Sequence, residues 1–365
     1  MNAANEYIQN FITNYHDYKE SWNYEDGCVL MGAVCLYEAT GDPMYRTFVL
    51  EYLNRRVQPD GSIPSFSIKQ YSIDNINPGK ALFFGRDETG DPRYEKAIQF
   101  HMQRLSQHPR CKCGNFWHKE IYPWQVWLDG LYMAQPFYMA YERDYDAYGH
   151  VQDITSQFCN VRKYLYNEEK KLYYHGFDES RTQPWCNRET GLSPNFWLRA
   201  MGWYLMALVD CIELCDEQLY EHRRALVDLL REAILGLLPY RDPQTGLFYQ
   251  VIDRSDIESN YIETSGSAMV ACSILKGVRL GVLADKYASI GDEMMQSILS
   301  NKLRKEDGVW HLCDICRVAG LGPGEKRDGS IAYYLSEEIC ADDSKGVGPF
   351  MMAYAEWLRL KGVKA

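Results

Sequence analysis

The sequence predicts an all-α fold, an (α/α)6 toroid in which six helical hairpins close into a ring with alternate helices on the inside. Apolar residues recur at helical spacing in twelve segments. One turn sequence recurs 49 residues later, which is about the length of one helical hairpin. The last of these segments is apolar and aromatic, whereas the end of an open solenoid requires a polar cap. Together the three observations favour a closed ring.

The same apolar patterns predict the individual helices and strands. The helices are predicted at residues 4–18, 27–39, 44–57, 78–88, 93–107, 129–142, 146–166, 196–215, 218–237, 262–282, 285–302 and 347–361. Short strands are predicted in three connecting loops, at Leu172–Tyr174, Leu247–Val251 and Val309–Leu312. No low-complexity linker divides the chain, so we expect residues 1–365 to form a single catalytic domain.

Two short sequences repeat between the helices. Thr40-Gly-Asp-Pro-Met-Tyr45 recurs as Thr89-Gly-Asp-Pro-Arg-Tyr94, with Asp as the expected N-cap and Pro at the first helical position. A second element follows later helix pairs, at Lys170–Tyr174, Thr245–Tyr249 and Asp307–Trp310. Such repetition indicates stacked copies of one unit.

Composition excludes several functional classes. Hydrophobic residues make up 46% of the chain and charged residues 24%, which is typical of a folded protein rather than a disordered one. The net charge of −11 and the lack of a basic run argue against nucleic acid or a membrane surface as a partner. No apolar run reaches the length of a membrane span, and residues 1–8 lack the features of a signal peptide. We therefore expect a cytoplasmic protein.

The twelve cysteines do not predict a metal site or a cofactor. Cys111 with Cys113 and Cys313 with Cys316 are the close pairs, and neither has a second pair or a histidine pair at a familiar zinc spacing. Most of the others sit singly among aliphatic residues and are typical of a core in a reducing compartment.

Two carboxylates are the candidates for acid–base chemistry, because a closed ring places its active residues where loops enter the inner helices. Asp129 follows three tryptophans, and aromatic surroundings favour the protonated form of a carboxyl group. Asp74 lies in the loop Tyr71–Gly79. Both residues have a structural alternative: Asp129 as an ordinary helix N-cap, and Asp74 as a turn former followed by a helix that begins at Pro78 with Asn77 as its cap.

Further polar and aromatic residues are candidates for binding a sugar. Arg199 and Trp203 are four residues apart on one helix face, next to Trp197, so a guanidinium could hold a carboxylate while an indole stacks on a sugar ring. Arg–Trp packing at this spacing is also ordinary on helix surfaces. His175 follows a short strand, and Tyr24 lies in the first loop that enters the ring.

At these residues the chain resembles the unsaturated rhamnogalacturonyl hydrolases, glycoside hydrolase family 105, which are related to the unsaturated glucuronyl hydrolases. The resemblance lies in motifs that run in order across nearly the whole chain: Asp74–Gly79, Phe116–Lys119, Trp127–Met133, Leu172–His175, Phe196–Trp203, Glu263–Met269, Arg327–Ser330, Tyr333–Glu337 and Lys345–Phe350. The family fold is an (α/α)6 barrel, in agreement with the helix pattern.

The resemblance implies a small acidic oligosaccharide as substrate, produced by a polysaccharide lyase and ending in a uronic acid with a C4–C5 double bond. It implies hydration of this vinyl ether, with Asp129 protonating C4 and water adding at C5, and Asp74 contacting the sugar hydroxyls. His175, Arg199 and Lys119 are implied as polar contacts and Trp197 and Trp203 as ring surfaces. Rhamnose is the implied leaving sugar. The alternatives are a glucuronyl substrate and a non-catalytic carbohydrate-binding toroid, and we expect a monomer or weak homodimer.

Two segments depart from the family pattern. Cys111-Lys-Cys-Gly114 stands where the family commonly has small or polar residues, and Trp124 stands where a small polar residue is usual. Both border the expected cleft, so they bear on the identity of the leaving sugar rather than on the reaction class.

Overall fold

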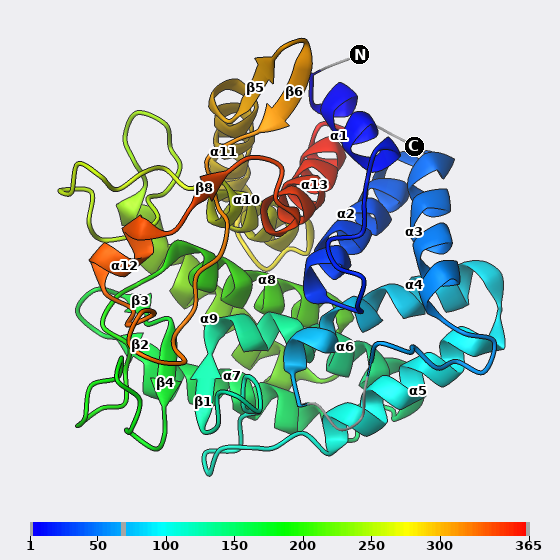
Figure 1. Ribbon diagram of the computed structural model, residues 1–365, viewed down its shortest axis with the longest axis horizontal. Coiled ribbons are helices and arrows are strands. Elements are labelled where there is room, and N and C mark those ends of the chain that lie inside the picture. The colour runs from blue at the N-terminus through cyan, green and yellow to red at the C-terminus, as the bar shows by residue number, and fades with distance from the viewer. Residues whose placement is uncertain (1–2, 67–70, 363–365) are drawn as a thin grey trace.

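The computed structural model describes residues 3–66 and 71–362, and it shows the predicted ring of helices (Figure 1). Six helices form an inner ring in which each contacts the next. They are α2 (Tyr24–Thr40), α4 (Lys80–Thr89), α6 (Leu128–Tyr145), α8 (Leu198–Leu214), α10 (Thr264–Arg279) and α13 (Ser344–Leu360). α6, α8, α10 and α13 are buried over almost their whole length, as expected for helices that are apolar on every side.

The outer helices precede or follow the inner ones along the chain and bury only one face. They are α1 (Ala3–Thr13), α3 (Pro43–Arg56), α5 (Pro92–Ser106), α7 (Val151–Leu165), α9 (Tyr220–Leu237) and α11 (Ala288–Asn301). Because an outer helix returns the chain between successive inner helices, the inner helices run parallel, and their N-termini meet at one end of the ring.

The ring is closed by packing of α13 against α2, which Figure 1 shows as the red helix beside the blue one. The Tyr354 hydroxyl on α13 also donates a hydrogen bond of 2.8 Å to Oδ1 of Asn5 on α1. The apolar C-terminal helix is thus an inner member of the ring rather than an exposed end, as the sequence predicts.

The recurring Thr-Gly-Asp-Pro turn has the predicted geometry at both positions. Gly41 and Gly90 end their helices in the left-handed conformation, at φ 69° and 65°. Asp42 and Asp91 then cap the next helix by accepting a backbone N–H, with Pro at the first helical position. A residue without a Cβ avoids strain at these left-handed positions.

Short antiparallel strands occupy the connecting loops, in four two-stranded sheets. They are β1 (Gln125–Trp127) with β4 (Gly176–Asp178), β2 (Tyr166–Asn167) with β3 (Leu172–Tyr173), β5 (Leu303–Glu306) with β6 (Val309–Leu312), and β7 (Ile315–Cys316) with β8 (Ile339–Cys340). Four 3-10 turns, η1 (Ile73–Asn75), η2 (Asn77–Gly79), η3 (Leu238–Tyr240) and η4 (Asp285–Tyr287), complete the described elements.

Several local predictions were wrong. The segment Leu247–Val251 forms isolated bridges, Tyr249 with Ile262 and Val251 with Trp197, instead of a strand. The first helix ends at Thr13 rather than residue 18, and α7 begins at Val151 rather than residue 146. The six-residue α12 (Ile331–Ser336) was missed because so short a segment shows little periodicity.

A cavity of about 390 Å³ lies at the end of the ring where the inner helices finish. All six inner helices line it, mostly with residues from their C-terminal halves, and α4 also contributes Lys80 from its first turn. In the described part of the chain no helix combines the length and apolar character that crossing a bilayer requires.

Candidate active site

Asp129 lies in the first turn of α6 and does not cap it. The N-cap residue is Trp127, whose side chain makes no capping hydrogen bond. Asp129 is 9% exposed, and its Oδ2 has no hydrogen-bond partner among the described residues. The N-cap alternative for Asp129 is therefore wrong, and one carboxylate oxygen makes no hydrogen bond with the described residues.

Pairing of β1 with β4 brings His175 to Asp129. Trp127 pairs with Gly176, and the Leu128 N–H donates to the carbonyl of His175 at 3.0 Å. The His175 Nε2 then lies 3.3 Å from Asp129 Oδ2, while its Nδ1 is hydrogen-bonded to the Tyr334 hydroxyl at 2.7 Å. Tyr334 on α12 thus fixes the orientation of an imidazole that faces the candidate acid.

Asp74 lies in the 3-10 turn η1, but its side chain forms an ion pair instead of bonding the backbone. Its Oδ2 lies 2.5 Å from Lys119 Nζ, so the alternative in which its side chain forms the turn is wrong. Asn77 does not cap a helix either, because Asn77–Gly79 is the 3-10 turn η2 and α4 begins at Lys80. Burial raises the pKa of Asp74, but Lys119 and His118 more than offset this, and the pKa of Asp74 falls below its usual value.

His118 lies between the two carboxylates and was missed as a site residue. Its Nε2 is 3.5 Å from Asp74 Oδ1, its ring stacks on Trp127 with centroids 4.3 Å apart, and Asp129 is among its electrostatic neighbours. Burial lowers the pKa of His118 to about 4. His118 is therefore neutral at neutral pH, and Lys119 is the cation that keeps Asp74 ionised. The motif Phe116–Lys119 already contained this histidine.

The two carboxylate-bearing segments approach closely because residue 130 is glycine. A Cβ on Gly130 would lie 2.7 Å from Ile73 Cδ1 and 3.3 Å from His118 Nδ1. A larger residue after Asp129 would push the start of α6 away from the Asp74 loop.

Arg199 lies in the first turn of α8 and is fully engaged with the protein. Its Nε donates to Ser265 Oγ at 2.8 Å, and its guanidinium also donates to the Cys316 carbonyl and lies 3.6 Å from Glu263. Burial lowers the pKa of Arg199, but Cys316 and Glu263 outweigh it and raise the pKa above the usual value. Its predicted role in holding a substrate carboxylate stays a prediction.

The aromatic candidates for sugar binding are buried to different extents. Trp197 lies beside His175, with ring centroids 4.8 Å apart, and its Nε1 donates to Gln250 at 3.1 Å. Tyr24 is half-buried at the start of α2, with Asp74 and Arg199 as electrostatic neighbours. Trp203 is 1% exposed and stacks on Tyr132, one turn of α6 below Asp129. The structure therefore places Trp203 in the packed interior of the ring, away from the other candidates.

The arrangement gives the two carboxylates different capabilities. Asp74 is ionised and neutralised by Lys119, which suits it to accept hydrogen bonds from hydroxyl groups. Asp129 has an oxygen without a hydrogen bond, 3.3 Å from His175 Nε2, which suits it to exchange a proton with a ligand. Within the described residues, the side chains with metal-ligand chemistry that lie close together are Cys111, Cys113 and Glu179, and Glu142, Asp146 and His150. Neither group includes a residue of this site.

Comparison with known proteins places the chain in a family. The model described as Glycosyl Hydrolase Family 88 matches residues 1–361. A family 105 glycoside hydrolase from C. acetobutylicum ATCC 824 is 40% identical, with a TM-score of 0.92 over 97% of this chain and 98% of that one. The unsaturated rhamnogalacturonyl hydrolase YesR of Bacillus subtilis is 26% identical over 273 residues, 73% of each chain. An unsaturated glucuronyl hydrolase from Bacillus sp. GL1 shares the fold, at 14% identity and a TM-score of 0.67, over 99% of this chain and 97% of that one.

Proposed function

The chain belongs to glycoside hydrolase family 88 together with its family 105 relatives, and we propose that it removes the 4,5-unsaturated uronic acid from the non-reducing end of lyase-generated oligosaccharides. The proposed substrate is an unsaturated galacturonyl-rhamnose unit. The name of the relative YesR supports this choice of substrate.

The observation that carries the proposal is the asymmetry between the two buried carboxylates. Hydration of a vinyl ether needs one group that delivers a proton to carbon and then recovers one from water. Each carboxylate keeps one buried oxygen without a hydrogen bond, but Lys119 holds Asp74 in its ionised form, whereas no lysine or arginine of the described residues pairs with Asp129. A classical two-carboxylate hydrolysis would require a second free carboxylate as nucleophile or base.

In the proposed reaction Asp129 transfers its proton to C4, and positive charge develops at C5 and the ring oxygen. Water adds at C5 and returns a proton to the Asp129 carboxylate. The resulting hemiketal opens at the bond between C5 and the ring oxygen, which gives a ketone at C5 and a hemiacetal at C1. The hemiacetal then collapses to an aldehyde at C1 and releases the neighbouring sugar with the glycosidic oxygen. His175, held by Tyr334, orients the Asp129 carboxyl group and the attacking water.

The local cations suit an acidic sugar in an acidic protein. Lys119 pairs with Asp74, and Arg199 lies in the first turn of α8, two residues after Trp197, although the chain carries a net charge of −11. Attraction of the substrate is therefore local, and added salt should weaken it.

The test uses the ultraviolet absorbance of the conjugated double bond in unsaturated galacturonyl-rhamnose and glucuronyl disaccharides. The wild-type chain should remove this absorbance, and Asp129→Asn should retain the fold while turnover falls by about 10²–10⁴-fold. Asp146→Asn, which changes an exposed carboxylate, is the matched control. Unchanged absorbance across the whole panel would favour a non-catalytic carbohydrate-binding toroid, and faster loss from the glucuronyl substrates would change the substrate assignment.

Reaction in heavy-oxygen water separates hydration from ordinary hydrolysis. We expect the label at C5 of the released keto acid and none in the leaving sugar. Label at the anomeric carbon would instead indicate the two-carboxylate route.

A further inference from the structure

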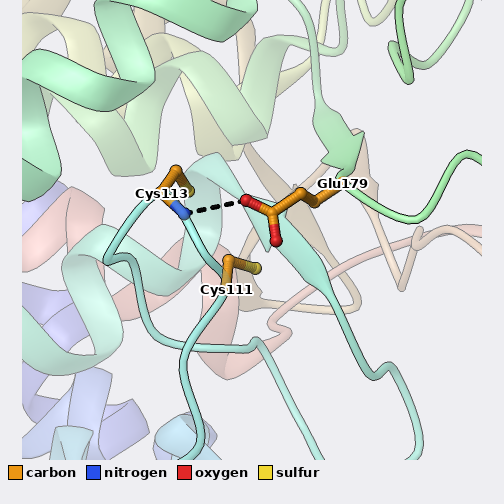
Figure 2. Close-up of side chains that lie close together, drawn as sticks. All are labelled: Cys111, Cys113 and Glu179. Atoms are coloured by element: carbon orange, nitrogen blue, oxygen red, sulfur yellow. Dashed lines mark hydrogen bonds between the residues drawn. The ribbon is translucent and has the colours of Figure 1, made fainter.

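Cys111, Cys113 and Glu179 come together outside the active site. Cys111 and Cys113 lie in the loop between α5 and β1, whereas Glu179 directly follows β4. Their ligand atoms, two Sγ and a carboxylate oxygen, all lie within 4.8 Å of one another. Figure 2 shows both cysteines beside the carboxylate of Glu179.

Backbone hydrogen bonds hold the carboxylate in position. The Lys112 N–H donates to one oxygen of Glu179 at 2.7 Å. The Cys113 N–H donates to the other oxygen at 2.8 Å, the bond drawn as a dashed line in Figure 2. Each oxygen keeps a further lone pair for a ligand bond. Metal-binding carboxylates in proteins are commonly oriented by such hydrogen bonds.

The loop that carries the two thiols is also fixed. The Cys111 N–H donates to the Asn115 carbonyl at 2.9 Å, and the Gly114 N–H donates to the Cys111 carbonyl at 3.0 Å. The Asn160 side chain donates to the Cys113 carbonyl at 2.6 Å. The backbone that carries both sulfur atoms is therefore held in place before any ion binds.

The charges of the cluster call for a cation. Glu179 brings a carboxylate to the two thiols, and its hydrogen-bond donors are backbone N–H groups that do not neutralise its charge. In the part of the chain that the structure describes, no lysine or arginine forms an ion pair with Glu179. Cys111 is buried, while Cys113 and Glu179 are half-buried, so an ion can reach the site from solvent.

We propose that Cys111, Cys113 and Glu179 form a zinc site with a water molecule as fourth ligand. Two thiolates, one carboxylate and an open position are a ligand set that Zn²⁺ accepts in tetrahedral geometry. In such a site the ligand atoms are roughly 3.5–3.8 Å apart, because zinc bonds sulfur at about 2.3 Å and oxygen at about 2.0 Å. Because the three ligand atoms lie within 4.8 Å of one another, binding needs a contraction of at most about 1.3 Å, to a separation of about 3.5 Å.

The site would fasten two segments of the proposed active site to each other. The loop that contains Cys111 and Cys113 continues into His118 and Lys119, and Glu179 follows the strand next to His175. The Glu179 N–H also donates to the Trp124 carbonyl at 3.0 Å. Zinc at this position stabilises the wall of the site and takes no part in the reaction.

The experiment measures zinc binding to the reduced, chelator-treated full chain by calorimetry, with Co²⁺ absorption as a second readout. We expect one Zn²⁺ per chain, a higher melting temperature with zinc, and thiolate-to-Co²⁺ charge-transfer bands. Cys111→Ser and Cys113→Ser should abolish all three. Glu179→Gln should weaken zinc binding by about tenfold or more, since loss of hydrogen-bond partners behind a ligand already costs that much.

Cys159→Ser removes an exposed thiol elsewhere and should bind zinc like the wild type. Equal zinc binding by the wild type and the Cys113→Ser variant would overturn the proposal. Absence of stoichiometric zinc binding to the reduced chain would also overturn it. In that case, a mass loss of two hydrogens in air would show that Cys111 and Cys113 form a disulfide and are a redox pair. Because the readouts are binding and melting, they are independent of glycoside hydrolysis.

Discussion

The cavity where the inner helices end contains two buried lysines, Lys80 and Lys276. Replacing each with methionine should change the free energy of unfolding in opposite directions. Lys80 is 8% exposed, and its Nζ lacks a hydrogen-bond partner within the described residues. Lys276 is equally buried, but its Nζ lies 2.6 Å from both Asp210 and Glu213. Methionine matches the lysine stem in shape and removes the charge.

The magnitude for Lys80 follows from its surroundings. Burial lowers the pKa of Lys80 from 10.5 to about 8, and at 1.36 kcal/mol per unit this corresponds to a cost of roughly 3 kcal/mol at neutral pH. The ammonium also lies 3.5 Å from the centre of the Tyr132 ring, and a desolvated cation–π contact offsets about 1–2 kcal/mol. Lys80→Met should therefore raise the free energy of unfolding by about 1–2 kcal/mol at pH 7.

The pH dependence identifies the cause. The folded-state pKa of Lys80 is lower than the unfolded one, so the cost is fully present below about pH 8 and is relieved as the pH rises towards 10.5. The advantage of Lys80→Met should shrink over that range. Lys276→Met should instead destabilise by about 3 kcal/mol, because it leaves two carboxylates without their shared cation.

Urea unfolding of both variants and the wild type at pH 7 and pH 9.5 provides the measurement. A loss of stability in Lys80→Met, or a gain that does not change with pH, would refute the reasoning. A gain in Lys276→Met would show that burial, rather than pairing, dominates at this end of the ring.

Three further predictions concern the proposed active site. Tyr334→Phe removes the hydrogen bond to His175 and should lower kcat by about 10–100-fold, whereas Tyr333→Phe should have little effect; steady-state kinetics decide. Arg199→Lys should weaken substrate binding, and Arg199→Ala should weaken it further, with a loss of about tenfold or more in kcat/KM. An alanine variant with a lower melting temperature but normal kinetics would show that Arg199 serves packing instead. Lys119→Met should cost about 1–3 kcal/mol of stability at pH 7. The difference should shrink as the pH falls below 3.8 and vanish once the pH is below the lowered pKa of Asp74; acid unfolding monitored by fluorescence tests this.

The ring could be predicted from the sequence because its signals are local. The Asp42-Pro43 and Asp91-Pro92 caps define the hairpin period, and the apolar segment from Val347 onward predicts an inner helix. The prediction of a strand at Leu247–Val251 was wrong because the residues there, although typical of strands, form single bridges to two different segments. Its partners, Trp197 and Ile262, could not be identified from the segment itself.

The site was predictable only where a motif marked it. Asp129 was ambiguous because a carboxylate at the start of a helix is equally typical of a cap, and only the position of Trp127 decides between the roles. His118 lies within the motif Phe116–Lys119, but its stacking on Trp127 is what positions it in the site, and residue spacing does not reveal that contact. Glu179 is more than sixty residues from Cys113, so no zinc spacing in the sequence could join them.

Closure of the ring by α13 on α2 also has a consequence during synthesis. The partner of the first inner helix is the last one to be translated, about 300 residues later. At a synthesis rate of about 5–20 residues per second, the apolar side of α2 lacks its partner α13 for roughly 15–60 s. Through that interval the nascent chain is an open arc with an uncovered hydrophobic edge, which is the kind of surface that chaperones shield.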